Sequence, residues 1–415
     1  MAIDNKDKKV LKSSIEREQN EPACSAEREK IKGSKNLNVP HLRFPEFTGE
    51  WKKSTIGSLS TKVGSGVTPR GGETVYKSEG HSFVRSQNVG WGHLQLDDIA
   101  FIDKETHLRQ KNTELQLDDV LLNITGASIG RSALVNKQIA GGNVNQHVCI
   151  IRTKDNLVPA FLCNFLLSNH GQKQIDSFQA GGNRQGLNFE QIRSIKITIP
   201  STKEQTKIAT LLHLIDERIA TQNKIIEDLK KLKSAISERL FKGIEGSFVL
   251  LSDICDIVKG KQINGENLSE SGNYYVMNGG TEPSGYYSDY NVEANSISIS
   301  EGGNSCGYVQ FNTLPFWSGG HCYSIQNIAD NVNNLYLYHY LKSNEDVIMK
   351  LRIGSGLPNI QKKDLAMFKI IVPKIERQIT ISTFLSSLER KVEIEERIQN
   401  AMLKEKLYLL QQMFI

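Results

Sequence analysis

The sequence predicts a mixed α/β chain in which one β-rich domain occurs twice and each copy is followed by a long helix. Three observations lead to this prediction: an internal duplication, a heptad pattern of apolar residues after each copy, and short strand-like runs that end at glycine turns. The 415 residues exceed one typical domain and can form two sizeable hydrophobic cores. We therefore expect two β-rich domains and two long antiparallel coiled-coil helices, related by an internal pseudo-twofold repeat.

Composition is that of an ordinary globular protein. Hydrophobic residues make up 38% and charged residues 23%, and no run of about 18 apolar positions could span a bilayer. The N-terminus is charged from Asp4 onward and lacks the apolar core of a secretory signal, so we expect a cytoplasmic protein without membrane association. The net charge of +5 permits nucleic-acid binding without indicating it.

The cysteines are widely spread and form no CxxC pair of the kind that zinc or redox sites use. We expect them to be reduced core residues, and we expect no metal and no cofactor in this chain. They are Cys24, Cys149, Cys163, Cys255, Cys306 and Cys322.

The duplication is clearest where each globular half ends. The run Ile192-Arg-Ser-Ile-Lys-Ile-Thr-Ile-Pro200 aligns with Leu365-Ala-Met-Phe-Lys-Ile-Ile-Val-Pro373 at an offset of 173 residues. Both runs have the alternation of a strand and stop at proline. The match continues without a gap into the next segment, where Gln205 corresponds to Gln378. Two α/β segments that are similar by coincidence are the alternative interpretation.

Earlier in each half the offset is 195, so the second copy is about 22 residues shorter. Gly130 and His147 correspond to Gly307 and His321, which puts most of the contraction before Gly126. The pairs at the larger offset are Ile56 with Leu251, Leu59 with Ile254, and Val63 with Val258.

The segment after the first copy has the apolar spacing of a coiled-coil seam. Positions alternately four and three residues apart are mostly apolar, and charged residues lie between them. About 40 residues of helix extend roughly 60 Å, too far for one small domain to cover the seam. The two copies of the helix should therefore pack on each other or on partner chains; helices inside one compact core are the alternative. The seam positions are 208, 212, 215, 219, 222, 226, 229, 233, 236 and 240.

The second helix begins in the same register, with Ile381, Leu385, Leu388 and Val392. The apolar pattern then moves to another set of positions, and this shift predicts a stutter near residues 392–394. The later positions are Ile394, Ile398, Met402 and Leu409.

Within each half, residues 119–126 and 296–302 predict a strand that enters a glycine turn. Residues 158–170 and 335–343 predict a helix in each copy. The expected organisation is a charged extension at 1–38, a first domain at 39–200, a first spacer helix at 201–246, a second domain at 247–373 and a second spacer helix at 374–415.

Catalytic motifs of DNA-modifying enzymes do not occur. A methyltransferase that extrudes its base needs a glycine-rich cofactor loop and an NPPY-type motif, and neither string is present. A phosphate-binding GxxxxGK[ST] loop is also missing, because Gln262 follows Gly260-Lys261 and the preceding glycine is lacking. No nuclease-like Pro-Asp with a following Glu-x-Lys is evident. The corresponding residues His147 and His321 have no carboxylate or cysteine at ligand spacing in both copies, so we interpret them as structural hydrogen-bonding histidines.

Polar residues at the turns suit a binding role. Arg, Asn and Gln can make two hydrogen bonds to a guanine or adenine edge, so loops rich in them fit recognition in the major groove. Asn and Gly are also simply what turns contain, which is the alternative reason for their presence. The candidate DNA contacts are Arg70, Arg85, Gln87, Asn88, Arg131, Asn143, Asn145, Gln146, Asn183, Arg184, Lys259, Lys261, Gln262, Asn278 and Asn304.

Several stretches together resemble the target-recognition domains of Type I restriction-modification specificity subunits. They are Pro40-His-Leu-Arg-Phe-Pro-Glu-Phe-Thr-Gly-Glu-Trp51, Phe83-Val-Arg-Ser-Gln-Asn-Val89, Asp119-Val-Leu-Leu-Asn-Ile-Thr-Gly-Ala-Ser-Ile-Gly-Arg131 and Asn145-Gln-His147, together with the ending Ile199-Pro200 before Glu204-Gln205, repeated as Val372-Pro373 before Arg377-Gln378. The resemblance covers residues 38–415. The second copy departs from the pattern at Arg377 and at Glu301-Gly-Gly-Asn-Ser-Cys-Gly307.

The resemblance implies a non-catalytic subunit with two target-recognition domains, each reading one half of a split site in double-stranded DNA. Two methyltransferase subunits would dock on the helices and supply S-adenosylmethionine chemistry, and restriction subunits would complete the assembly. Two rival functions remain: an adaptor whose duplicated domains bind protein or carbohydrate, and a divergent enzyme fragment.

Overall fold

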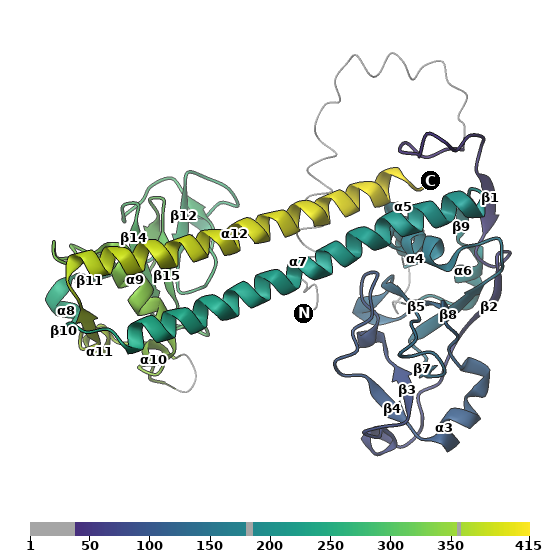
Figure 1. The fold of residues 1–415 in the computed structure, drawn as a ribbon, viewed down its shortest axis with the longest axis horizontal. Coiled ribbons are helices and arrows are strands. Elements are labelled where there is room, and N and C mark those ends of the chain that lie inside the picture. Colours follow the sequence, from purple (N-terminus) through teal and green to yellow (C-terminus); the bar gives the residue numbers. More distant parts are fainter. Residues whose placement is uncertain (1–37, 180–185, 355–357) are drawn as a thin grey trace, which may run out of the picture. The chain divides into compact units, whose positions relative to one another are not determined.

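The computed structural model describes residues 38–179, 186–354 and 358–415 (Figure 1). The expected extension at 1–38 therefore lies outside the described residues, apart from Asn38. The chain divides into two compact units, Met1–Ala220 with Asn400–Ile415 (unit 1) and Thr221–Gln399 (unit 2). Among the residues that the structure describes, no helix has the length and apolar character needed to cross a membrane.

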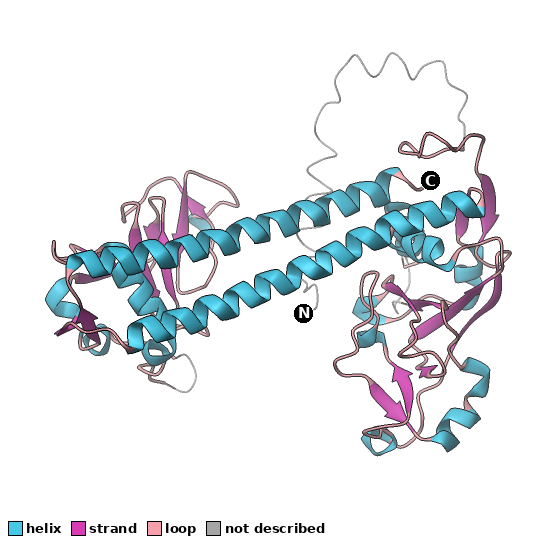
Figure 2. Ribbon diagram, in the orientation of Figure 1, coloured by secondary structure: helices cyan, strands magenta, loops and turns pink. Residues whose placement is uncertain are grey.

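Unit 1 contains a four-stranded sheet, a three-stranded sheet and a separate strand pair. Strands are magenta and helices cyan in Figure 2. The four-stranded sheet is antiparallel throughout, in the order β2-β8-β5-β6. In the three-stranded sheet, β3 is antiparallel to β4 and parallel to β7. The strands are β1 (Lys52–Thr55), β2 (Ser60–Ser65), β3 (His81–Val84), β4 (Ala100–Ile102), β5 (Val120–Asn123), β6 (Ser132–Leu134), β7 (Asn143–Val144), β8 (Val148–Thr153) and β9 (Lys196–Ile199), which pairs with β1.

Unit 2 repeats this topology strand for strand. Its sheets have the orders β11-β17-β14-β15 and β13-β12-β16, with a separate pair β10-β18. The predicted mixed α/β class and the internal duplication are confirmed. The strands are β10 (Ser247–Leu250), β11 (Asp256–Lys259), β12 (Tyr274–Met277), β13 (Tyr286–Tyr287), β14 (Ser296–Ser300), β15 (Val309–Asn312), β16 (Trp317–Ser318), β17 (Cys322–Gln326) and β18 (Lys369–Val372).

Strand pairing corrects one predicted correspondence. Val63 lies opposite Ile151 on β8, and Ile257 lies opposite Ile325 on β17, so Val63 corresponds to Ile257 and not to Val258. The pairing of β2 shifts between Ser60 and Lys62, where the first copy has one extra residue. A β-bulge of this kind changes the offset between the copies by one residue. An alignment that ignores it assigns every later residue of the strand to the wrong face of the sheet.

Part of the length difference between the copies is the helix α3 (Lys104–Arg109) with its flanking loops, between β4 and β5. Asp103 caps this helix by accepting a hydrogen bond from the Thr106 amide at 2.8 Å. In unit 2 no helix is present between β13 and β14, where residues 288–295 are all described. Most of the contraction therefore lies before Gly126, as predicted.

The helix predicted at 158–170 is two helices, α4 (Pro159–Leu167) and α5 (Asn169–Ser177). Ser168 separates them, because its backbone is extended and its side chain accepts a hydrogen bond from the Gly171 amide. The counterpart predicted at 335–343 is α9 (Asn334–Ser343), followed by α10 (Glu345–Met349). The described residues also form the short α-helices α6 (Phe189–Ser194), α8 (Leu251–Ile254) and α11 (Lys362–Ala366), besides several 3-10 turns.

The two long helices are α7 (Thr202–Lys242) and α12 (Ile375–Gln412). In unit 1 the Lys406 ammonium lies 2.5 Å from the Asp216 carboxylate. In unit 2 the Gln399 amide bonds Asn223, and Lys233 pairs with Glu389, so the helices run antiparallel there. Every predicted seam position of α7 is buried or half-buried, which confirms the coiled-coil pattern.

The predicted stutter in α12 is wrong. Buried and half-buried positions continue with unbroken spacing of four and three residues, through Glu395, Gln399 and Lys406, to Met413. Ile394 and Ile398 are instead 44% and 39% exposed. The apolar pattern shifts because polar residues occupy the seam, not because the helix changes its phase. Gln222, itself a seam residue, donates to the Glu395 carboxylate at 2.6 Å.

Each unit has its own core. In unit 1, residues from both ends of the sequence meet, since Phe414 packs on Phe161 at 5.1 Å between ring centroids, and Phe161 packs on Trp51 at 5.9 Å. In unit 2, Phe241 at the end of α7 packs edge-on against Tyr340 of α9. The predicted core positions of the cysteines are confirmed where the structure describes them, and none of these five takes part in a disulfide: Cys149, Cys163, Cys255, Cys306 and Cys322.

Candidate nucleic-acid interface

In unit 1, loops that are distant in sequence meet at one end of the four-stranded sheet. Two of them follow β2 and β5 and one precedes β8, and antiparallel pairing places these strand ends side by side. The loop after β3, in the three-stranded sheet, joins them, because the Asn123 side chain at the end of β5 donates to the Ser86 carbonyl at 2.8 Å. The Gln146 side chain accepts a hydrogen bond from the Thr68 amide at 3.1 Å, and the Thr125 hydroxyl lies 2.6 Å from Nδ1 of His147. A Cβ at Gly66 would lie 1.7 Å from the Val144 carbonyl oxygen, so this close approach requires glycine. We call this set of loops the recognition end of unit 1.

A carboxylate that the sequence did not single out organises the loop after β3. Asp98 accepts hydrogen bonds from the side chains of Gln87 and Asn88, and its carbonyl oxygen accepts one from Arg85 at 2.7 Å. The Arg85 guanidinium also lies over the Tyr76 ring, 5.8 Å from its centroid. Since Arg85 and Gln87 both meet Asp98, their donors are held in place before any ligand binds.

Three of the asparagines chosen from sequence are buried and bonded within the chain. Asn88 is fully buried and donates to the Gln95 carbonyl at 2.9 Å. Asn143 is also fully buried, between the Gln110 carbonyl and the His107 ring. Asn145 is 7% exposed and accepts from the His147 amide. In this structure these side chains hold loops in position through hydrogen bonds within the chain.

The other candidates of unit 1 differ in their exposure to solvent. Arg70 and Gln146 are exposed, while Arg131 is half-buried and its Nε has no hydrogen-bond partner among the described residues. Asn183 and Arg184 lie outside the described residues.

Unit 2 brings its candidates together at the corresponding end of its own sheet. The Lys261 amide donates to the Ser318 carbonyl at 2.8 Å, and the Asn278 side chain accepts from the His321 amide at 3.1 Å. Gln262 lies against the turn that precedes β17, since a Cβ at Gly320 would be 2.3 Å from its Oε1. These loops form the recognition end of unit 2, and Asn304 in the turn after β14 is exposed beside them.

The corresponding histidines have different neighbours. His147 lies between the Thr125 hydroxyl and the Gln146 amide, in agreement with the predicted structural role. The His321 side chain is 64% exposed, and its Nδ1 lies 3.8 Å from the Glu301 carboxylate. Glu301 is a site residue that the choice of Arg, Asn and Gln missed. A comparison of the two copies could have identified Glu301, because the corresponding residue of the first copy is the apolar Ile124.

Both recognition ends present polar side chains on backbones fixed by sheet pairing. Such an arrangement suits hydrogen bonding to a ligand that displays donors and acceptors in a row. Within the described ranges, no group of three or more His, Cys, Asp or Glu could hold a metal ion.

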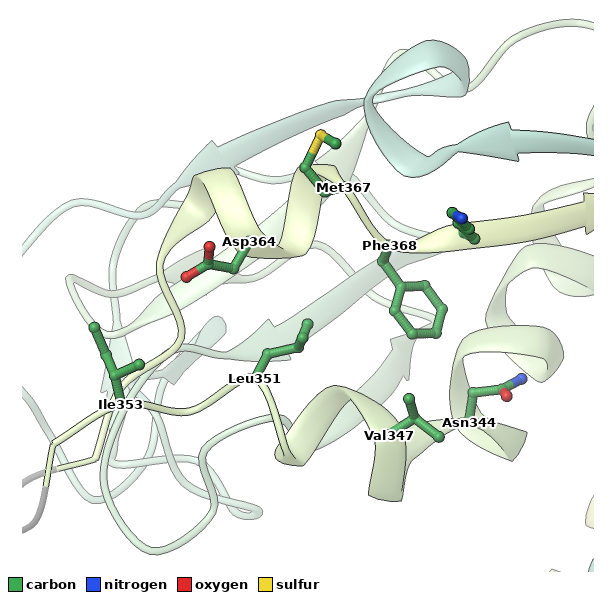
Figure 3. Close-up of a pocket in the computed structure, with 8 residues that line it drawn as sticks. Asn344, Val347, Leu351, Ile353, Asp364, Met367 and Phe368 are labelled. Carbon is green, nitrogen blue, oxygen red and sulfur yellow. The ribbon is translucent and has the colours of Figure 1, made fainter.

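A shallow hollow in unit 2 contains none of the candidate residues (Figure 3). Apolar side chains from α10, α11 and the loops after them line most of it: Val347, Leu351, Ile353, Met367 and Phe368. In unit 1 the residue that corresponds to Val347 is Gln174, whose amide bonds the backbone of Lys196 on β9. The hollow therefore belongs to the second copy and lies outside the recognition end.

A family model described as "Type I restriction modification DNA specificity domain" matches residues 48–231 and again residues 245–404. The chain belongs to this specificity family. Its two matched segments contain the two recognition ends, and the duplication seen in the sequence is thus a duplication of the family's domain.

Relatives of this specificity protein are similar along most or part of the chain. A Methanocaldococcus jannaschii protein named for the MjaX type I restriction enzyme specificity subunit is 22% identical over 400 residues, which are 88% of this chain and 92% of that one. The Type I restriction enzyme EcoBI specificity subunit of Escherichia coli is 26% identical over 209 residues, 49% of this chain and 43% of that one. The crystal structure of a Type I restriction-modification S subunit from M. genitalium shares the fold, with a TM-score of 0.61 and 19% identity, over 91% of this chain and 99% of that one.

Proposed function

We propose that this protein is the DNA sequence-specificity subunit of a Type I restriction-modification complex and that each recognition end reads one half of a bipartite site. The observation that carries the proposal is the convergence of corresponding strand-end loops in both copies of a family domain named for DNA specificity. Donors and acceptors there stand on fixed backbones, as recognition of base edges requires. The proposed contacts are the exposed candidates: Arg70, Gln87, Gln146, Lys259, Lys261, Gln262 and Asn304.

The proposed division of labour follows the expected domains. Residues 39–200 and 247–373 are the two readers, residues 201–246 and 374–415 are the spacer helices, and residues 1–38 are an extension. We propose that the chain itself performs no catalysis and holds no cofactor, because its sequence lacks the motifs that bind S-adenosylmethionine and extrude a base.

The proposed partners are two methyltransferase subunits on the helices and restriction subunits in the full complex. Support comes from large apolar side chains that lie outside the seam and remain exposed. Exposed apolar surface of this kind marks sites of protein association. These residues are Leu214, Ile225 and Leu232 on α7, and Phe384, Ile394 and Ile398 on α12, with exposures between 39% and 56%.

Domain exchange tests the two-reader proposal. Residues 39–200 would be replaced by the corresponding segment of a relative, and methylated sites would be mapped in cells that carry either version. We expect one half-site to change while the other half-site and the spacer stay the same. A simultaneous change of both halves would contradict independent readers. Loss of all methylation would call for the reciprocal exchange of residues 247–373, which should change the opposite half-site.

A two-headed adaptor that binds protein or carbohydrate is the alternative. Duplex binding by the full chain with its co-purifying partners separates the two functions. The adaptor should show no preference among duplex sequences, whereas the specificity subunit should select one bipartite sequence.

A further inference from the structure

The second copy buries a carboxylate where the first copy has an apolar side chain. Glu301 directly follows β14 and is 8% exposed, and Ile124 directly follows β5 and is 5% exposed. Their backbones make the same contact, since the amide of Ile124 donates to the His147 carbonyl and that of Glu301 to the His321 carbonyl. The two positions thus differ only in the side chain.

This charge does not serve the stability of the fold. A buried ion pair is seldom more stable than apolar residues of similar volume, because both charges lose their hydration. Ile124 shows that the domain folds with an apolar residue at this position. A function at the recognition end is therefore the better reason for Glu301.

Glu301 holds the ammonium group of Lys259. Nζ of Lys259 lies 2.6 Å from Oε1 of Glu301, and the hydroxyl of the buried Tyr323 lies 3.1 Å from the same oxygen and 3.1 Å from the Ile360 carbonyl oxygen, to either of which it can donate. Burial, and then the neighbouring carboxylate, raises the pKa of Tyr323, so the hydroxyl remains a donor. In unit 1 the residues with the same strand pairing are Ser65 and Cys149, and this arrangement has no equivalent there.

The ion pair with Glu301 determines how Lys259 can bind a ligand. Its side chain remains 54% exposed, so the ammonium has N–H donors left for a ligand after it donates to Glu301. Because the Lys259–Glu301 pair carries no net charge, it attracts a phosphate only weakly. The N–H donors of the Lys259 ammonium, held in a fixed direction, are then its means of binding a ligand. Lys261 offers the contrast: it is exposed and has no ion-pair partner among the described residues.

We propose that Lys259 reads an acceptor on a base edge, such as O6 or N7 of guanine, in the half-site of unit 2, and that Glu301 is its positioning residue. This inference rests on the proposed DNA-recognition function. Lys261 then serves as a phosphate contact that attracts DNA without selecting its sequence.

The test uses the full-length chain with its co-purifying partners and a library of duplexes randomised in the second half-site. K259M and E301I should relax the preference at the same single base pair by about tenfold. E301Q keeps an oxygen that accepts from Lys259 and should retain most of that preference. The matched control K261M should weaken binding to all sequences alike and lower the slope of log affinity against log salt by about one.

Thermal unfolding of each variant shows whether it still has the native fold. K259M takes the Lys259 ammonium away from the buried Glu301 carboxylate. The double variant K259M/E301I, which also removes the buried charge, is therefore measured beside it and should show the same relaxed preference at that base pair. The inference is overturned if E301I and the double variant keep the wild-type preference, or if they weaken all sequences equally and lower the salt slope as K261M does. A wild-type protein that selects no sequence at either half-site would instead contradict the proposed function itself.

Discussion

At the scale of single residues, the recognition ends combine side chains that face solvent with side chains that hold the loops. Asn88 is of the second kind: it accepts from the Arg85 amide at 2.9 Å and donates to the Gln95 carbonyl and the Asp98 carboxylate. Its neighbour Gln87 is exposed, and its side-chain amide donates to the Asp98 carboxylate. The same loop thus contains a structural amide and an accessible one.

Replacing Asn88 should destabilise unit 1. Asn88→Ala removes a fully buried amide that bonds the Arg85 amide, the Gln95 carbonyl and Asp98, and should lower the free energy of unfolding by about 2–3 kcal/mol. The measurement is urea unfolding followed by tryptophan fluorescence, because Trp51 and Trp91 lie in unit 1. The control Gln87→Ala should change stability by less than about 0.5 kcal/mol. Equal effects of the two substitutions would mean that Asn88 is not the structural amide.

A buried histidine should make unit 2 sensitive to acid. His339 on α9 is 3% exposed, and burial lowers its pKa to about 4, with Lys233 adding to the effect and Glu389 opposing it. The unfolded chain binds a proton near pH 6.5, so this contribution to stability is complete above that pH and is lost as pH falls toward 4. The loss should reach about 3 kcal/mol.

His339→Asn, which introduces the residue found at the corresponding Asn164, removes this titration. Urea unfolding of both proteins at several pH values, followed by Trp317 fluorescence, gives the difference between them. That difference should change between pH 6.5 and 4 and stay constant above pH 7. A difference that is independent of pH would show that His339 titrates normally in the folded chain.

Sequence reasoning found the right loops but not the role of each side chain in them. Arg, Asn and Gln occur in those loops for two reasons, ligand binding and loop closure, and composition does not separate the reasons. Only the pairing of β3 with β7 reveals that Asn143 lies inside the domain. Glu301 could have been found, because a charged residue in one copy opposite an apolar residue in the other marks a difference in function.

At the scale of the helices, the seam of α7 was predictable in full, and that of α12 in its first half and again at Met402 and Leu409. Periodicity of apolar residues identifies a buried stripe only while the stripe is apolar. In α12 the stripe includes Glu395, whose pKa is lowered by hydrogen bonds from Lys391 first and from Gln222 second. A polar pair in a seam fixes the register of the two helices at a cost in stability.

Removing this polar pair should therefore stabilise the helix pair in unit 2. The double variant Gln222→Leu with Glu395→Leu should have a higher Tm than the wild type, since the seam gains apolar contact without an unpaired group. Gln222→Leu alone leaves the Glu395 carboxylate against an apolar side chain and should lower Tm. Calorimetry of all three proteins gives the comparison. A double variant less stable than the single one would show that the pair is stabilising.

At the scale of the whole molecule, the duplication was readable from sequence because the offset of 173 residues persists across a strand, a proline and a helix. The differences between the copies were harder to read. A bulge and an added helix, α3, change the offset by amounts that only strand pairing reveals.

Matched insertions test whether the helices set the spacing between half-sites. A copy of residues 221–227 would be inserted after Glu227, and a copy of residues 394–400 before Ile394, so that both seams keep their register. Each helix gains about 10 Å, and the recognised spacer should grow by about three base pairs while the half-sites stay the same. Methylation mapping reads the outcome. An active protein with an unchanged spacer would show that α7 and α12 do not set the distance between the half-sites. As a control, the insertion in α7 alone mismatches the seams and should prevent assembly.

The packing of Phe414 against Phe161 has a consequence for synthesis on the ribosome. Unit 2 is one continuous stretch of chain, whereas unit 1 needs residues 400–415 to complete its core. Domains usually fold in the order in which they are translated. Here the unit that is begun first is finished last, and it waits through the translation of the whole second copy with part of its core open. A message cut short before codon 400 would yield a chain with a complete unit 2 and an unfinished unit 1, so protein made from damaged messages would reach the cell's proteases with exposed apolar surface.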